Sequence, residues 1–261
     1  GYKGNLSHIG AEVLDTTKTS AYGDEPCLLK EKLETTRVVI GADRFASYEK
    51  FKQDELVAIM DDGFQHLKLQ RTFNIVLIDS NDSWYDSSVF PSGKYREDLS
   101  ALEDADLIIL TKAEINLNIN RSMARIKKYF PYKKMMVSRI AFDEIVPLNL
   151  NKTQEIKKDI ILICGIGDAK SFEDQLLAKK FNIIKRYILK NHKDYTPSEI
   201  NRFLKESKEL DASILMTEKD AIKWPTDQIL DFSVFIFKIK IDLDESNLME
   251  ILLPQIKGMR C

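Results

Sequence analysis

Short runs of apolar residues recur along the chain, and polar segments with turn residues separate them. Apolar runs of this length, bounded by polar residues, are typical of strands that are buried in a parallel sheet. The predicted strands are residues 37–40, 56–60, 74–78, 106–110, 135–140, 160–164, 213–216 and 233–241, with a further strand near 181–188.

Between many of these strands, apolar residues recur at the three- and four-residue spacing of a helix face. Two segments also carry helix start signals, since Ser171 precedes Asp174 by three positions and Thr196 precedes Pro197. The predicted helices are residues 43–51, 118–130, 171–180, 197–209 and 245–256. This alternation predicts an α/β fold with a parallel sheet flanked by helices on both faces.

The pattern also predicts two domains, with a break after Phe130 and Pro131. A self-contained series of strands and helices over residues 160–216 lies between the strands at 135–140 and 233–241. The predicted first domain is residues 1–134, completed by residues 244–261. Residues 135–146 and 233–243 form a two-stranded linker to a smaller α/β domain, residues 147–232.

The amino-acid composition excludes some classes of protein. The 39 Lys and Arg residues nearly balance the 41 Asp and Glu residues, so the net charge is −2 and a nucleic-acid partner is not expected. A hydrophobic content of 44% excludes a disordered chain. Cys27, Cys164 and Cys261 are odd in number and far apart, which favours a reducing compartment. No apolar run approaches the roughly 20 residues that span a bilayer.

Glycine is scarce for an α/β protein, with 10 residues in 261. The motif G-x-x-x-x-G-K-[ST] of phosphate-binding loops does not occur in the sequence. Residues 163–171 contain Gly-x-Gly and Lys-Ser but not at the required spacing, so we interpret them as a strand-to-helix turn.

Three segments have residue types that perform chemistry. Asp61 and Asp62 follow an apolar run and precede Gln65 and His66; strand-end carboxylates can hold Mg²⁺, although Asp-Asp-Gly alone is typical of a turn. Asp24 and Glu25 precede Pro26 in an expected first helical turn, where an acid is usually a capping group but can be a general base.

The third segment, residues 91–97, contains Arg96 and Glu97. Arg96 could neutralise phosphate charge and Glu97 could support a metal, or the two could form a solvated pair. His192 is one of three histidines, and a lone loop histidine is more often structural than catalytic.

Read in order, these segments resemble those of the tetraacyldisaccharide 4'-kinase family, the lipid A 4'-kinases of Gram-negative bacteria. The segments that support the resemblance are Gly1-Tyr2-Lys3, Gly23-Asp24-Glu25-Pro26, Gly41-Ala42-Asp43-Arg44, Asp61-Asp62-Gly63-Phe64-Gln65-His66, Pro91-Ser92-Gly93-Lys94-Tyr95-Arg96-Glu97, Gly165-Ile166-Gly167, Asn191-His192 and Thr217-Glu218-Lys219-Asp220.

The resemblance implies a P-loop kinase-like α/β fold with a second, smaller α/β domain. It implies an enzyme that transfers the γ-phosphate of ATP, with Mg²⁺, to the 4'-hydroxyl of a tetraacyldisaccharide 1-phosphate in lipid A biosynthesis. Such an enzyme is a peripheral protein at the cytoplasmic face of the bacterial inner membrane.

The resemblance also assigns roles to residues. Asp24 matches the catalytic aspartate, and His192 matches the histidine that assists it. Asp61 and Asp62, with Glu97, match groups that support the metal. Glu25, Gln65, His66 and Arg96 fall in segments expected to contact nucleotide or substrate.

Two departures change the expectation. Asn191 stands where the family usually has an aspartate, so its hydrogen bond to His192 would be uncharged and weaker. The family's phosphate loop and membrane-associating helix lie upstream of the segment matched by residues 1–3. We therefore expect an N-terminally truncated chain with little kinase activity of its own. The alternatives are a catalytically silent glycolipid-binding protein derived from the kinase and, less strongly, a metal-dependent hydrolase using Asp61 and Asp62.

Overall fold

The computed structural model describes residues 4–53, 57–82, 88–93, 95–116, 118–149, 155–165, 169–189, 195–225, 229 and 231–258. The chain separates into two compact units. Unit 1 comprises Gly1–Phe51 and Asp143–Lys238, and unit 2 comprises Lys52–Phe142 and Ile239–Cys261. The chain passes between them three times, once after Phe51 and then within two strands, β6 (Arg139–Pro147) and β10 (Val234–Asp242).

The two crossings within β6 and β10 fall inside the ranges predicted for a two-stranded linker, and the crossing after Phe51 does not. Residues 1–51, however, group with residues 143–238, whereas the sequence analysis assigned them to the same domain as residues 52–134. The grouping has a packing reason, because Ile222 joins the cluster of Val13, Tyr22 and Cys27. The division into functional domains stays a prediction.

Unit 1 is built on a five-stranded sheet in the order β6-β10-β9-β7-β8. It includes β7 (Asp159–Cys164), β8 (Asn182–Ile188) and β9 (Ser213–Thr217). The pairs β10–β9, β9–β7 and β7–β8 are parallel. The central strands β7 and β9 are buried on both faces, which explains their continuous apolar runs.

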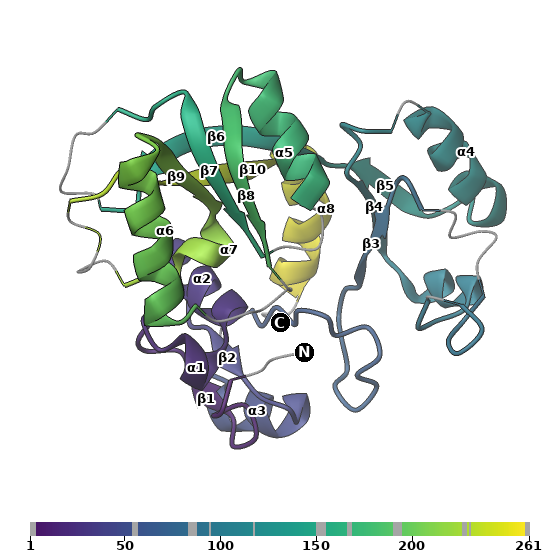
Figure 1. Cartoon of the computed structure of the whole chain (residues 1–261). Coiled ribbons are helices and arrows are strands. Elements are labelled where there is room, and N and C mark those ends of the chain that lie inside the picture. The colour runs from purple at the N-terminus through teal and green to yellow at the C-terminus, as the bar shows by residue number, and fades with distance from the viewer. Residues whose placement is uncertain are drawn as a thin grey trace. The chain divides into compact units, whose positions relative to one another are not determined.

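Helices cover both faces of this sheet (Figure 1). On one face, Ile161 and Ile163 share a core with Phe203 of α6 (Pro197–Glu209). On the other, Phe237 of β10 meets Phe172 of α5 (Ala169–Ala178), with ring centroids 5.1 Å apart. Side chains alternate between faces along a strand, so one strand serves both cores. The predicted α/β class, with a parallel sheet flanked by helices, is confirmed.

The start of α6 follows its sequence signal. Thr196 is the N-cap, and its hydroxyl accepts from the backbone N–H of Glu199 while the Glu199 carboxylate accepts from that of Thr196. This capping box satisfies two N–H groups that the helix leaves unpaired. The predicted bounds of 197–209 are therefore those observed.

The first part of unit 1 is a small layer beside the sheet. Its elements are β1 (Ala11–Glu12), α1 (Thr19–Tyr22), α2 (Asp24–Lys32), β2 (Val39–Ile40) and α3 (Arg44–Phe51). Strands β1 and β2 pair antiparallel. The short helix α7 (Glu218–Ala221), which follows β9, contacts α2 (Figure 1).

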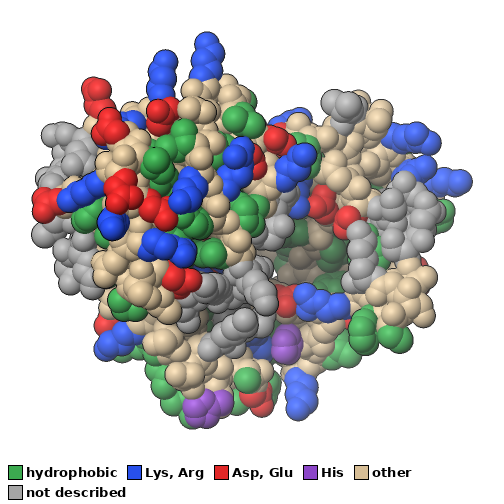
Figure 2. Space-filling model, in the orientation of Figure 1, with side chains coloured by type: hydrophobic (Ala, Val, Ile, Leu, Met, Phe, Trp, Pro, Cys, Tyr) green, Lys and Arg blue, Asp and Glu red, His purple; other side chains and the backbone are tan. Residues whose placement is uncertain are grey.

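Charges of both signs lie interspersed over the helices of unit 1 on the face drawn in Figure 2. Opposite charges also pair in this unit, as Lys205 does with Glu209 on α6 and Arg186 with Glu173 between β8 and α5. This mixture matches the near balance of acidic and basic residues in the composition.

Unit 2 contains a three-stranded parallel sheet, β3 (Ile75–Asp79), β4 (Leu107–Thr111) and β5 (Lys134–Val137). On one face, Ile108 and Leu110 pack with Ile126 of α4 (Ile119–Tyr129) and with the 3-10 helix η1 (Leu99–Asp104). On the other, Leu107 and Ile109 pack against α8 (Glu245–Gly258).

Two strand predictions need correction. Residues 57–60 form no strand, and Ile59 is 93% exposed, because this apolar run pairs with no strand in the described part of the chain. The single strand predicted at 135–140 is two strands, since Ser138 bonds to Leu110 of β4 before β6 begins at Arg139. Within the described ranges, no helix has the length and apolar character needed to cross a membrane.

Candidate functional site

Asp24 is the first residue of α2, as predicted, and lies in unit 1. Gly23 precedes it with φ +96°, a conformation that L side chains rarely adopt, so glycine is needed where the chain turns into the helix. Asp24 Oδ2 lies 3.1 Å from Lys223 Nζ, and Oδ1 accepts from the Glu25 backbone N–H at 3.1 Å. The Asp24 side chain is 13% exposed.

The N-cap of α2 is Gly23, which has no side chain to cap the helix, and Asp24 accepts from the first-turn N–H of Glu25. Besides this bond at the helix start, Asp24 forms an ion pair with a residue outside α2. The side chains of Asp24 and Lys223 are both nearly buried where they pair. The neighbouring pair, Glu25 with Lys219 at 2.9 Å, is less buried, since the Glu25 side chain is half exposed. The two acidic residues that begin α2 thus form ion pairs with two lysines that follow β9, one in α7 and one just after it.

Cys27 lies on the same helix and is buried. Burial, with smaller contributions from the Asp15 and Asp24 charges, raises the pKa of the Cys27 thiol to about 11. The thiol therefore stays protonated at neutral pH and is a poor nucleophile. Cys164, at the end of β7, is likewise a buried free thiol.

In unit 2, the structure brings together two predicted residues that are 34 positions apart. Arg96 Nη1 donates to Asp62 Oδ2 at 3.0 Å, and Arg96 Nη2 lies 3.0 Å from Asp62 Oδ1. The hydrogen bonds to Asp62, and then its charge, raise the pKa of the Arg96 guanidinium above its ordinary value. Arg96 is 66% exposed and Asp62 50% exposed, so solvent reaches the pair.

The segment that holds Asp61 and Asp62 is a turn fixed by an arginine that sequence reasoning missed. Arg71 Nη1 donates to the carbonyls of Gly63 at 2.8 Å and Phe64 at 3.0 Å, with a longer contact of 3.4 Å to His66. Its guanidinium also lies 5.7 Å from the centre of the Phe64 ring. No local pattern announces Arg71, since its role depends on where the turn folds back.

The loop of Arg96 closes through backbone bonds. The Phe90 N–H donates to the Tyr95 carbonyl at 2.8 Å, and the Gly93 N–H donates to the Val89 carbonyl at 3.0 Å. A Cβ on Gly93 would lie 1.8 Å from the Ser88 carbonyl oxygen, so no larger residue fits this turn unchanged. Glycine thereby permits the turn that precedes Arg96.

The remaining predicted site residues differ in how much the structure says of them. Gln65 and Glu97 are exposed, and His66 is half-buried with its N–H bonded to the Gly63 carbonyl. Asn191 and His192 lie outside the described residues, so the pairing of Asp24 with His192 stays a prediction. In the Gly-x-Gly segment, β7 ends at Cys164 and α5 begins at Ala169, with residues 166–168 also outside the described ranges.

The family-like segment Gly41-Ala42-Asp43-Arg44 is a helix start. Asp43 accepts from the Ala46 N–H at 3.0 Å, and the Ser47 hydroxyl bonds to the Asp43 carbonyl at 2.8 Å. Arg44 donates to the Gly41 carbonyl at 2.8 Å. These contacts explain the residue types by local structure alone.

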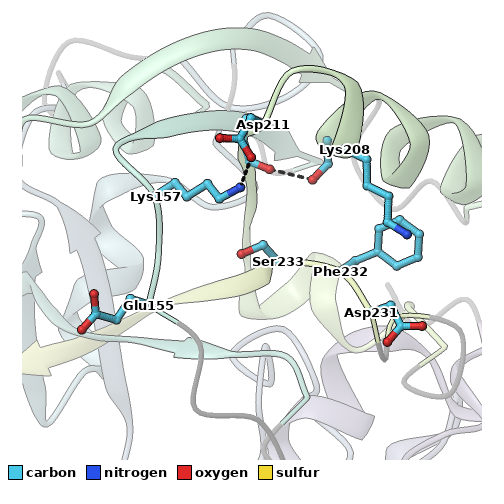
Figure 3. Close-up of a pocket in the computed structure, with 9 residues that line it drawn as sticks. Glu155, Lys157, Lys208, Asp211, Asp231, Phe232 and Ser233 are labelled. Atoms are coloured by element: carbon cyan, nitrogen blue, oxygen red, sulfur yellow. Dashed lines mark hydrogen bonds and ion pairs between the residues drawn. The ribbon is translucent and has the colours of Figure 1, made fainter.

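A cavity of about 390 Å³ lies elsewhere in unit 1 (Figure 3). Its residues Lys157, Asp211 and Phe232 precede β7, β9 and β10, so it is at the amino ends of these strands. Ligands of open parallel sheets bind at the carboxyl ends. Lys157 is also paired with Asp211, and Lys208 covers the Phe232 ring at 4.2 Å. We therefore do not place the chemistry in this cavity.

The donor chemistry at Asp61 and Asp62 fits a magnesium ion. Mg²⁺ takes oxygen ligands and is usually held by one or two carboxylates together with phosphates of the substrate. In the described part of the chain, no cluster of three or more His, Cys, Asp or Glu residues is placed to hold a metal by itself. Two adjacent carboxylates beside an arginine match a site that a phosphorylated ligand completes.

Carboxylates beside an arginine on an α/β fold are an arrangement found in many enzymes that act on phosphates. The profile of the tetraacyldisaccharide-1-P 4'-kinase family matches residues 1–257, and the chain belongs to this family. The members of the family are kinases, so the resemblance found in the sequence is confirmed.

Individual relatives agree with this assignment. The tetraacyldisaccharide 4'-kinase of Desulfotalea psychrophila is 29% identical over 241 residues, which cover 85% of this chain and 67% of that protein. The enzyme of the same name from Francisella tularensis subsp. novicida is 29% identical over 251 residues, covering 90% and 74%. LpxK from Aquifex aeolicus, solved in complex with ATP, matches with a TM-score of 0.71 and 25% identity over 98% of this chain and 76% of that chain.

Proposed function

We propose that the protein phosphorylates the 4'-hydroxyl of a tetraacyldisaccharide 1-phosphate, with ATP as phosphate donor, in lipid A biosynthesis. Membership of the kinase family supports the acceptor, and the ATP complex of the Aquifex relative supports the donor. The observation on which the proposal chiefly rests is the two-point pairing of Asp62 with Arg96, which joins a metal-type carboxylate to a phosphate-type cation.

In the proposed reaction the 4'-oxygen forms a bond to the γ-phosphorus, the bond from that phosphorus to the β,γ-bridging oxygen breaks, and ADP leaves. Asp24 accepts the hydroxyl proton, assisted by His192. Arg96 neutralises phosphate charge, and Glu25, Gln65 and His66 contact nucleotide or substrate. Most of the rate acceleration in such transfers comes from positioning and charge neutralisation.

Asp61 and Asp62, supported by Glu97, would hold Mg²⁺. When bound, the ion neutralises charge on the phosphates. These carboxylates and Arg96 provide opposite charges close together, which is the arrangement a metal–triphosphate complex requires.

We further propose peripheral attachment at the cytoplasmic face of the bacterial inner membrane, because the acceptor has four acyl chains and resides in a bilayer. The sequence of residues 1–261 has no G-x-x-x-x-G-K-[ST] motif. We therefore expect a polypeptide of these residues alone to transfer phosphate slowly or not at all.

The test uses the full-length gene product with radiolabelled ATP, Mg²⁺ and the tetraacyldisaccharide 1-phosphate in detergent micelles. We expect label to enter the glycolipid, and Asp24→Asn to reduce the rate at least about 100-fold, the usual contribution of a general base. Glu31→Gln, an exposed change on the same helix, is the control. Glycolipid binding without phosphorylation would contradict the proposal and favour the silent binding protein.

A further inference from the structure

The segment of residues 217–223, which contains α7 and directly follows the rest of β9, is anchored by a buried aspartate. Asp220 is 1% exposed and accepts from the Gly165 N–H at 3.0 Å, the Thr217 hydroxyl at 2.7 Å and the Tyr195 hydroxyl at 2.8 Å. Burial, followed by the Asp220 charge, raises the pKa of Tyr195 far above its ordinary value, so its hydroxyl remains a donor. These bonds fix α7 at the carboxyl ends of β7 and β9.

From this anchored segment, three side chains reach α2. Glu218 pairs with Lys32 at 2.8 Å, Lys219 with Glu25 at 2.9 Å, and Lys223 with Asp24 at 3.1 Å. Two of these pairs include a side chain that is about half exposed to solvent. In the third, Lys223 is 4% exposed and Asp24 13%.

Burial separates the roles of the three pairs. Exposed pairs contribute little to stability and hold their groups loosely, because solvent competes with them. In a buried ion pair, solvent does not compete with the two side chains, so each holds the other in a defined position. Removal of one partner leaves the other charge buried without compensation. Of the three pairs, the one between Lys223 and Asp24 is therefore the one that can fix a side chain in a single orientation.

We propose that Lys223 is a positioning residue, which holds the carboxylate of Asp24 in the orientation needed to accept the hydroxyl proton. This role rests on the proposed function, in which Asp24 is the base. Oδ2 is oriented by the Lys223 ammonium and Oδ1 by the Glu25 N–H.

The geometry also explains why a lysine beside a base is compatible with catalysis. An ammonium group at this distance favours the ionised carboxylate, which is the form that can take up a proton. The cost is that the same charge weakens the carboxylate as an acceptor. A fixed orientation favours the transfer, because a displacement of about 1 Å in such a group can cost about 100-fold in rate.

The test measures kcat and KM for both substrates in the full-length gene product. We expect Lys223→Met to reduce kcat about 10- to 100-fold with each KM within about twofold of wild type. Lys32→Met breaks the more exposed pair between α2 and Glu218 of α7 and is the matched control, with kcat expected to be unchanged. Lys223→Gln, which can still hydrogen-bond to Asp24, replaces Lys223→Met if that variant does not fold.

A double variant distinguishes positioning from independent contributions. If Lys223 acts through Asp24, then Lys223→Met should have no further effect on kcat in an Asp24→Asn background. An equal loss in both backgrounds, an unchanged kcat in Lys223→Met, or an equal loss in Lys32→Met would overturn the positioning role alone. An inactive wild-type protein would overturn the proposed function and the positioning role with it.

Discussion

Arg96 and Asp62 form a two-point ion pair, in which each terminal guanidinium nitrogen lies 3.0 Å from a different carboxylate oxygen. The fork of an arginine matches a carboxylate or a phosphate equally well. Because the pair is exposed to solvent, it is worth only about 0–1 kcal/mol to folding. Its geometry therefore fits a functional role better than a structural one.

The variant Arg96→Met tests whether the ion pair matters for activity and not for folding stability. We expect the free energy of unfolding to change by less than about 1 kcal/mol. We expect the kinase rate of the full-length gene product to fall at least about 100-fold, because charge stabilisation of the phosphates is lost. Lys18→Met, which removes an exposed pair with Asp15, is the control for both measurements. A stability loss as large as the activity loss would contradict this view.

Arg71 should matter for the turn that holds Asp61 and Asp62. Arg71→Met removes the hydrogen bonds to the carbonyls of Gly63 and Phe64, and we expect a loss of about 1–3 kcal/mol in the free energy of unfolding. Hydrogen exchange followed by mass spectrometry should show faster exchange across residues 61–70. Lys68→Met, an exposed change in the same segment, should leave exchange unaltered. Unchanged exchange in Arg71→Met would mean that the turn holds without this arginine.

Gly93 is the tightest point of the Arg96 loop. In Gly93→Ala the new methyl group would meet the Ser88 carbonyl at 1.8 Å, so the backbone must shift. We expect a loss of about 1–3 kcal/mol, as for other overpacked sites, together with reduced kinase activity. Ser92→Ala, at the neighbouring exposed position, is the control for urea unfolding. A Gly93→Ala variant as stable as Ser92→Ala would refute the close approach.

Most regular elements could be predicted because their signals are local. The α6 helix followed from Thr196, Pro197 and its apolar period, and the strands of unit 1 followed from continuous apolar runs. The run at 57–60 has the same local pattern, but a strand also needs a partner, and partners are set by distant residues. Local pattern alone therefore fails at this position.

The site shows the same limit. The sequence suggested Asp24, Asp62 and Arg96 by their residue types and by family resemblance. It gave no indication that Lys223 and Arg71 would contact two of these segments, since each contact depends on how separate elements pack. The unassigned motif Thr217-Glu218-Lys219-Asp220 also acquired a role only in the structure, where it anchors α7 and reaches α2.

The ion pair between Asp79 and Lys112 predicts a pH dependence of stability. Asp79 ends β3, and its carboxylate lies 2.9 Å from Lys112 Nζ, just after β4. Burial tends to raise the pKa of Asp79, but hydrogen bonds from Lys112 and Asn81 outweigh it and the pKa is lowered. A carboxyl group whose pKa is lower in the folded protein stabilises the fold above its unfolded pKa of about 4. That contribution is lost as the pH falls through the lowered folded value.

Asp79→Asn should therefore cost about 1–2 kcal/mol in urea unfolding at neutral pH, because it removes a charge-assisted hydrogen bond. The difference from wild type should shrink as the pH falls below about 4, where the wild-type carboxylate also takes up a proton. Glu103→Gln, an exposed carboxyl change in the same unit, should show no such convergence. If the cost of Asp79→Asn stayed constant across the acidic range, it would come from packing and not from the charge, and the ion pair would not be what joins the ends of β3 and β4.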